Sequence, residues 1–372
     1  RYQRAQKLEK TAILDEFIKN TGYNRSYARR AIGAAKTRDF RVKKRIHRVR
    51  PHTYIPGVIL KPLSKLWDIS NFICGKRLAP LIADYLFVLR RDKLWDYPAS
   101  VDDELTKISA ATIDRLLTPI RKKMTLKGRT MTKPGTMLKH QIPIRTWADW
   151  NENIPGFFEA DTVAFCGSNL SGDFAWGIDM TDVCIGWVLL EISPNRGQHA
   201  IHEGMRAMMK RLVYLVLGID SDNGGEFIND ILYRFCLFMH ITFTRTRAGK
   251  KNDNCYVEQK NFTSLRTFLG YCRIETEEQI AIAKEILELA EIFINFFQSS
   301  TKLIEKKRVG THTIKHYDKA LTPYKRLLKL GILSKRQRQQ LYKVYSTHNP
   351  QELTEKIRVL QDKLRRACSV TI

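Results

Sequence analysis

The sequence predicts a multidomain protein: all-α modules come first, an α/β core with a mixed five-stranded sheet follows, and a helical tail ends the chain. Three observations lead to this prediction. A chain of 372 residues exceeds one ordinary hydrophobic core, and 43% apolar residues can fill several. Short apolar runs with strand character alternate with helical periodicity between residues 151 and 300. Helices are the main elements expected before residue 125 and after residue 300.

The charge of the chain points to a polyanionic partner. Lys and Arg number 64 against 38 acidic residues, a formal net charge of +26. A cation that neutralises a phosphate releases a counterion, so such an excess favours nucleic acid. No apolar stretch approaches the roughly 18 residues of a spanning helix, and no signal peptide is apparent. We therefore expect a cytoplasmic protein with no membrane partner and no small-molecule cofactor.

Cysteine and histidine spacing indicates neither a disulfide framework nor a zinc site. The 7 cysteines are scattered, odd in number and never spaced C-x-x-C. His199 and His202 are three residues apart on an expected helix, but no partner ligands lie nearby in the sequence.

Residues 1–50 read as a helix-turn-helix region followed by a basic run. Helical spacing covers residues 5–20, the stretch NTGYN breaks it, and Ser26 is expected to cap a second helix through residue 32. Such a pair alone is often only a solvated surface, but the run RVKKRIHRVR favours DNA contact. The expected DNA contacts here are Arg25, Arg29, Arg30, Arg41, Lys43, Lys44 and Arg45.

Residues 51–124 read as a second helical, DNA-binding region. Residues 60–95 are rich in Leu, Ile, Phe and Trp, as in a buried scaffold. Ser100 is expected to cap one helix, and a turn at residues 108–109 provides the cap of the next, 110–121. This arrangement predicts a second helix-turn-helix. Residues 125–150 have little periodicity and read as a basic linker.

Residues 151–300 carry the elements of the α/β core in the order β-β-β-α-β-α-β-α. The first strand, GFFEADTVAFCG, holds Asp161 midway. The fourth, expected over residues 213–219, runs into a Gly- and Asn-rich turn that carries Asp222. A polar loop then leads into a helix whose second turn holds Glu258, with 35 residues between the two acids.

The stretches GIDSDNGGEF and KKNDNCYVEQKN, together with LKHQIPIRTWADW and TPYKRLLKLGIL, resemble the DDE transposase and integrase superfamily. Within it, the chain is most similar to bacterial insertion-sequence transposases with a retroviral-integrase-type catalytic core, from about residue 15 to the final helix. The HHCC zinc domain of retroviral integrases is absent. The resemblance implies a ribonuclease-H-like core in a bacterial enzyme. It also implies metal-dependent cleavage at transposon ends and transfer of the 3′-OH ends into target DNA.

By this resemblance Asp161, Asp222 and Glu258 are the catalytic and metal-binding residues. Three carboxylates suit two Mg²⁺ ions, for which Mn²⁺ can substitute, because hard cations activate the attacking hydroxyl and stabilise the leaving oxygen. Taken singly, Asp222 also fits an Asx turn and Glu258 an exposed helix start. Glu159 and Asp220 lie two residues before the two aspartates, on the same strand faces, and are the alternative assignments.

The sequence predicts further DNA contacts near the helix that should hold Glu258. Lys250 and Lys251 in the preceding loop are candidates for phosphates, and a solvated role is the alternative. Asn254 and Asn261 flank Glu258 by about one helical turn.

Residues 301–372 read as a basic helical C-terminal region, with a hairpin-like segment, a Pro-capped helix and two further helices. Double-stranded DNA is the expected partner, as transposon ends and as target. Because two ends must be held together, we also expect a homo-oligomer, at least a dimer. The apolar stripe of residues 277–297 is a candidate contact, with burial in the core as the alternative.

Two other functions fit the same fold. A domesticated DNA-binding regulator would have lost the chemistry, and the presence of all three acids argues against it. A structure-selective nuclease would not need tandem helix-turn-helix modules, which point to defined end sequences.

Overall fold

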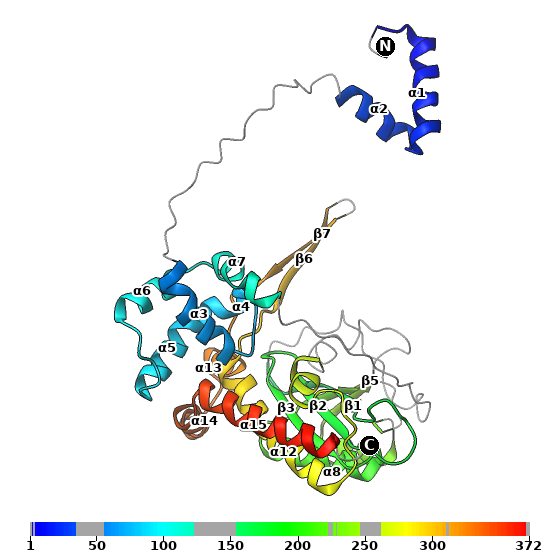
Figure 1. The fold of residues 1–372 in the computed structure, drawn as a ribbon. Coiled ribbons are helices and arrows are strands. Elements are labelled where there is room, and N and C mark those ends of the chain that lie inside the picture. The colour runs from blue at the N-terminus through cyan, green and yellow to red at the C-terminus, as the bar shows by residue number, and fades with distance from the viewer. Residues whose placement is uncertain are drawn as a thin grey trace. The chain divides into compact units, whose positions relative to one another are not determined.

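The computed structural model describes residues 2, 4–34, 56–122, 154–221, 226–227, 229–245, 262–309 and 312–369 (Figure 1). The chain divides into two compact units, Arg1–Thr53 and Tyr54–Ile372. Within the described ranges, no helix is long and apolar enough to cross a lipid bilayer.

The first unit contains two helices, α1 (Lys7–Thr21) and α2 (Arg25–Ala34). α1 ends at Gly22, whose φ of 68° is a left-handed conformation that glycine adopts without steric cost. α2 begins after Asn24, whose side chain accepts a hydrogen bond of 2.8 Å from the backbone amide three residues further on. The expected cap at Ser26 is therefore wrong, because Ser26 lies inside the helix that Asn24 caps.

The second unit begins with a helical module. Ser109 caps the last of its helices as predicted, since its hydroxyl accepts a hydrogen bond of 3.2 Å from the Thr112 amide. Ser100 does not cap a helix, because the helix begins at Ala99 with Pro98 at the cap position, two residues earlier than expected. The elements of the module are α3 (Pro56–Ile69), α4 (Gly75–Leu78), η1 (Ala79–Leu81), α5 (Ile82–Arg91), α6 (Ala99–Lys107) and α7 (Ala110–Arg121).

The core is a mixed five-stranded sheet with helices around it, as the sequence predicts. The strand order is β3-β2-β1-β4-β5. β1 pairs antiparallel with β2 and parallel with β4, β2 pairs antiparallel with β3, and β4 pairs parallel with β5, so β1 is central. The strands are β1 (Phe157–Ala164), β2 (Trp176–Asp182), β3 (Val188–Ser193), β4 (Gly218–Ser221) and β5 (Thr242–Arg245).

The expected fourth strand over residues 213–219 differs from the observed β4. Residues 213–217 are apolar and pack partly against the core, but they have no strand partner. The Gly156 carbonyl accepts a hydrogen bond of 2.7 Å from the Leu217 amide, but Gly156 lies just before β1, which begins at Phe157. Strand pairing therefore starts at Gly218, where β1 becomes available.

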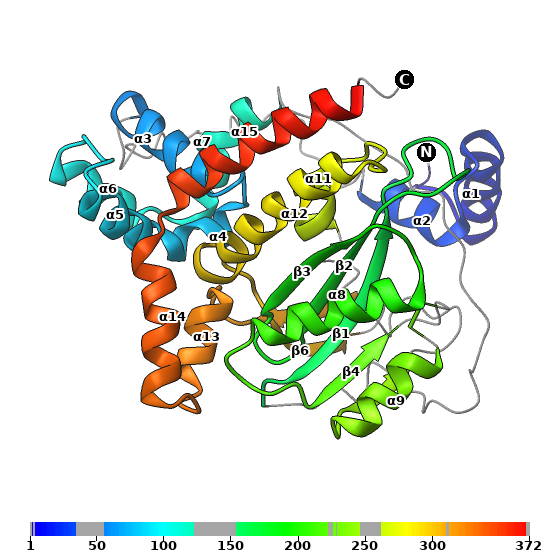
Figure 2. The same ribbon diagram turned by 90° about the horizontal axis from the view of Figure 1, so that it is seen from below.

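Helices cover both faces of the sheet (Figure 2). α8 (Gln198–Lys210) lies so close to β2 that a Cβ on Gly204 would stand 2.6 Å from the Ile178 side chain. α9 (Asp230–Phe238) packs beside α8 and β5. The other face meets the π-helix η4 (Phe262–Arg266), followed by α11 (Thr267–Leu269) and α12 (Glu277–Ile292), which continues as the π-helix η5 (Phe293–Phe297).

The helix predicted over residues 277–297 exists and is buried by the chain itself. Most of its apolar residues are buried, with Ile286 0% and Phe293 1% exposed, because α12 packs between β3 and α15. Asn295 also closes the outer edge of the sheet, accepting the Val188 amide at 2.8 Å and donating to the Val188 carbonyl at 2.7 Å. Glu291 accepts the Leu190 amide at 3.0 Å.

The C-terminal region consists of a hairpin and three helices, in the predicted order. Pro323 occupies the first turn of α13, after the Thr322 cap. The elements are β6 (Leu303–Val309), β7 (His312–Tyr317), α13 (Pro323–Lys329), α14 (Lys335–Thr347) and α15 (Pro350–Ser369).

The helical module is fastened to the C-terminal half of the same unit. The Tyr85 hydroxyl donates to the Phe297 carbonyl at 2.7 Å, and Arg77 donates to the Ser299 carbonyl at 2.7 Å. At the far end of the module, Arg358 of α15 forms an ion pair of 2.7 Å with Asp68. Hence residues 56–122 pack against the C-terminal half and belong to the same compact unit.

Candidate active site

Asp161 lies midway along the first strand, as predicted, and its side chain is partly exposed. This strand, β1, is the central one of the sheet. One carboxylate oxygen of Asp161, Oδ1, accepts a hydrogen bond of 2.8 Å from the Thr162 amide. Across the antiparallel pair, its directly opposite residue is Asp179. Residues directly opposite one another share a face of the sheet, so two carboxylates meet here.

This face of the sheet is acidic and largely buried. Glu159 is opposite Thr181 on one side and Asp220 on the other, and Asp220 is opposite Thr244. The exposed fractions of Glu159, Asp179 and Asp220 are at most 1%. Buried carboxylates need hydrogen-bond donors, and hydroxyl groups from the neighbouring elements supply several of them.

Asp179 receives two of these hydroxyl groups. Thr181 donates to its Oδ1 at 2.9 Å, and Ser264 of η4 donates to its Oδ2. Thr244 donates to Asp220 at 2.5 Å. Glu159 and Asp220, the alternative assignments for the two aspartates, are therefore deep in the sheet, whereas Asp161 is partly open to solvent.

The strand that leads to Asp222 ends beside Asp161. Ser221, its last residue, pairs with Ala160 of β1. Asp222 follows Ser221 in the sequence, and residues 222–225 lie outside the described residues.

Glu226, the first described residue after Ser221, is fixed to β1 as well. Glu226 is 4% exposed, and its Oε1 accepts a hydrogen bond of 2.8 Å from the Thr162 hydroxyl. Its Oε2 forms an ion pair of 2.6 Å with Arg196, whose guanidinium lies 4.7 Å from the centre of the Trp176 ring. Both Ser221 and Glu226 are therefore held next to the residues that flank Asp161.

Glu258 also lies outside the described residues, but the segment that follows it is anchored on the same face. η4 begins at Phe262, four positions after Glu258. Besides the bond from Ser264 to Asp179, a Cβ on Gly177 of β2 would stand 3.0 Å from the Leu265 side chain, so the absence of a side chain at residue 177 makes room for Leu265. Arg266 donates to the Ala164 carbonyl at 2.8 Å and lies 4.9 Å from the Phe165 ring.

Burial and hydrogen bonding act in opposite directions on the pKa of Asp182, an acid of the sheet that lies away from this face. Asp182 accepts backbone hydrogen bonds of 2.8 Å from Gly156 and Cys184, and a bond of 3.2 Å from the Tyr214 hydroxyl. Burial outweighs these donors and raises the pKa of Asp182 to about 6. Its role is to close the end of β2 against the start of β1.

The other predicted contacts are distributed as follows. Arg25, Arg29 and Arg30 are exposed on α2, and Arg25 forms an ion pair with Asp15 of α1. The remaining predicted DNA contacts lie outside the described residues: Arg41, Lys43, Lys44, Arg45, Lys250, Lys251, Asn254 and Asn261.

The donor set predicted for metal is made of carboxylates, the ligands that Mg²⁺ prefers. Of the three, the structure describes only Asp161. Within the described part of the chain, no group of three or more His, Cys, Asp or Glu side chains is arranged to hold a metal ion by itself. A complete site would thus require Asp222 and Glu258.

Sequence reasoning missed Asp179, Ser264 and Glu226. Period-two alternation puts Asp179 and Thr181 on one face of β2, but only the antiparallel register places Asp179 opposite Asp161. For Glu226 the sequence offers one signal, its place near the end of the Gly-rich stretch GIDSDNGGEF. The structure adds that Glu226 is buried, and a buried charged residue needs a partner.

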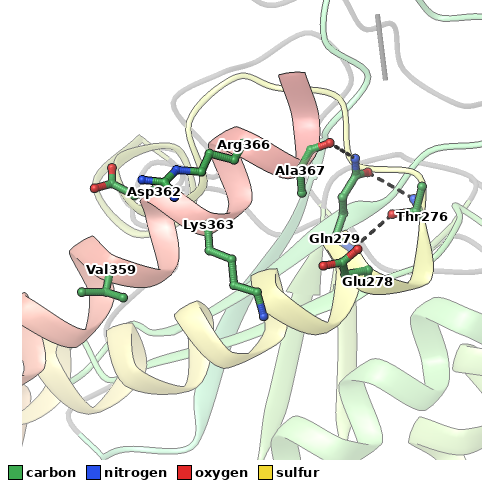
Figure 3. A pocket seen from close by; sticks show the side chains of 8 residues that line it. All are labelled: Thr276, Glu278, Gln279, Val359, Asp362, Lys363, Arg366 and Ala367. Carbon is green, nitrogen blue, oxygen red and sulfur yellow. Dashed lines mark hydrogen bonds between the residues drawn. The ribbon is translucent and has the colours of Figure 1, made fainter. Parts of the chain in front are cut away.

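A surface groove of about 840 Å³ is lined by residues of α12 and α15 (Figure 3). Gln279 fixes its floor, donating to the Ala367 carbonyl at 3.2 Å and accepting the Thr276 amide at 3.2 Å. Glu278, Lys363 and other charged side chains of both signs line it. Asp161, the predicted catalytic residue that the structure describes, does not line this groove.

The chain resembles known proteins both in sequence and in structure. No family model matches the chain. The catalytic core domain of BIV integrase is similar at 19% identity and a TM-score of 0.31, over 47% of this chain and 95% of that one. The uncharacterized protein y4rM of Sinorhizobium fredii (strain NBRC 101917 / NGR234) is 32% identical over 328 residues, 88% of this chain and 91% of y4rM. This chain belongs to the same protein family as y4rM.

Proposed function

We propose that this chain is the DNA transposase of an insertion sequence, with a ribonuclease-H-like core that cleaves transposon ends and transfers their 3′-OH groups into target DNA. The observation that carries the proposal is the convergence of three anchored segments around Asp161. Ser221 pairs beside it, Glu226 binds the adjacent Thr162, and Ser264 binds the opposite Asp179. In the sequence, Asp222 lies between Ser221 and Glu226, and Glu258 lies six positions before Ser264.

In this proposal Asp161, Asp222 and Glu258 hold two Mg²⁺ ions. When bound, the ions supply Lewis acidity to the attacking hydroxyl and to the leaving oxygen. The chain's own contribution is to bring the carboxylates together and to keep them in place. The Thr162 amide orients Asp161 through its Oδ1, and the partly exposed carboxylate of Asp161 supplies oxygen ligands of the kind that hard cations prefer.

We propose that double-stranded DNA is bound partly by the first unit. Arg29 and Arg30 are exposed on α2, and guanidinium groups suit both phosphates and guanine edges. Moving a segment requires two ends, so the active species would contain at least two protomers. The apolar stripe of α12 is buried within the chain, which leaves other surfaces for that contact.

The test is cleavage by the full chain of DNA that carries the flanks of its gene, with Mg²⁺ or Mn²⁺. Asp161→Asn, Asp222→Asn and Glu258→Gln should each reduce cleavage by about 10³-fold or more, because each removes a ligand that stabilises charge in the transition state. DNA binding, measured by gel shift, should be unchanged.

Asp173→Asn is the matched control, because Asp173 is exposed in the loop between β1 and β2. This variant should cleave DNA as the wild type does. Near wild-type cleavage by any of the three variants would remove that acid from the site. Binding without cleavage in the wild type would favour the regulator.

A further inference from the structure

The β6–β7 hairpin is a second charged feature, separate from the acidic face. Figure 1 shows it projecting as a two-stranded arm. Between residues 303 and 317, the sequence LIEKKRVGTHTIKHY has four Lys or Arg residues and one Glu. The described side chains of both strands are exposed, including Lys307, Lys315 and His316.

Large apolar side chains are exposed on the same arm. Ile304 is 70% exposed, Tyr317 51% and Ile314 44%. A lone two-stranded hairpin is at best marginally stable in water, and apolar exposure adds to that cost. These properties indicate a surface that gains stability when something covers it.

The charge of the arm favours a polyanionic partner. Lys307 and Lys315, one on each strand, are both exposed, and Lys and Arg outnumber Glu in the sequence of the arm. A polyanion neutralises these charges, whereas a second copy of a chain with a net charge of +26 adds to the repulsion. The charge pattern therefore selects nucleic acid over self-association.

The arm is held firmly at its root. Asp318 accepts the Lys302 amide at 2.6 Å and donates its own amide to the Lys302 carbonyl at 2.9 Å. Arg326, which is 9% exposed in α13, forms an ion pair with Asp318 and donates to the Ser300 carbonyl at 2.7 Å. A ligand on the arm is thereby held in a fixed relation to α13.

We infer that the β6–β7 hairpin is a binding arm for duplex DNA, with its lysines on the phosphates. Strands of six and seven residues are about 20 Å long, and a two-stranded ribbon fits the major groove. Phosphate contact carries no sequence information, so the arm serves target or flanking DNA of any sequence. This inference rests on the proposed function, because it adds a contact to the same substrate.

The experiment compares binding of the full chain to a duplex of scrambled sequence, without divalent metal, over a range of salt. Lys307→Gln with Lys315→Gln should weaken binding about tenfold at physiological salt and lower the salt slope by about 2. Glu305→Gln, which removes the one acid of the arm, should strengthen binding. Thermal unfolding should stay as in the wild type, since these side chains are exposed.

Lys343→Gln with Lys356→Gln is the matched control, with the same change of charge on exposed faces of α14 and α15. If the control weakens binding as much as the arm variant, only the overall charge matters and the inference fails. It also fails if the arm variant binds like the wild type, or if it alters the size of the DNA-free protein and leaves DNA binding intact.

Cleavage assays on the same proteins separate the two proposals. A wild type that cleaves, together with an arm variant that binds normally, contradicts the arm alone. A wild type that binds through the arm but never cleaves contradicts the transposase alone. A wild type that does not bind DNA contradicts both.

Discussion

The five-stranded sheet and the β6–β7 hairpin use charged residues in opposite ways. In the sheet, Glu159, Asp179 and Asp220 are at most 1% exposed, and Thr181, Ser264 and Thr244 donate hydrogen bonds to the two aspartates. In the hairpin, Lys307 and Lys315 face solvent. Buried charge must be matched by the fold, while exposed charge is left for a partner. The difference separates a region that builds a site from one that offers a contact.

The largest expected effect comes from breaking a matched charge. Glu226→Ala removes the acceptor of both Thr162 and Arg196. We expect a loss of about 3 kcal/mol in the free energy of unfolding, below the upper end for buried pairs because Arg196 is partly exposed. We also expect a fall in cleavage, because the turn that follows Asp222 loses its tie to β1. Chemical denaturation and cleavage assays measure the two.

Glu226→Gln is the control for this prediction, because it keeps an oxygen for Thr162 and loses only the charge. It should be milder on both measures. An unchanged stability of Glu226→Ala would mean that the sheet does not depend on this pair.

A smaller effect, with a pH dependence, is expected at Asp182. Asp182→Asn replaces one acceptor oxygen by a donor that faces the Gly156 amide, and should cost about 2 kcal/mol at low pH. The native pKa is raised from 3.8 to about 6, so the stability from protonated Asp182 is full below pH 3.8 and is lost as pH rises through about 6.

The stability advantage of the wild type over Asp182→Asn should therefore shrink between pH 4 and pH 7. Denaturant unfolding at a series of pH values measures it. An advantage that grows with pH would show that the backbone donors, and not burial, dominate the pKa of this acid.

The smallest effect is expected in the hairpin. Ile304→Thr changes a side chain that is 70% exposed, so the free energy of unfolding should change by no more than about 0.5 kcal/mol. Thermal unfolding measures this change. A substantial destabilisation would mean that the arm is packed within the protein, and the contrast with the sheet would disappear.

Much of the core was predictable because its signals are local. The first three strands and the position of Asp161 follow from short apolar runs, and the Thr322–Pro323 start of α13 from its residue types. β4 was misplaced because residues 213–217 are as apolar as a strand, while the end of β1 decides where pairing begins. The Asp161–Asp179 and Ser264–Asp179 relations depend on register and on a π-helix, which residue periodicity does not encode.

The closure of β3 by Asn295 has a consequence for biosynthesis. The two residues that make this contact are 107 positions apart, so the ribosome releases β3 well before Asn295 emerges. Until then, the Val188 and Leu190 amides form an open edge that can pair with another nascent chain. The yield of folded protein should thus depend on synthesis passing residue 295, and chains truncated before it should aggregate even though all five strands are present.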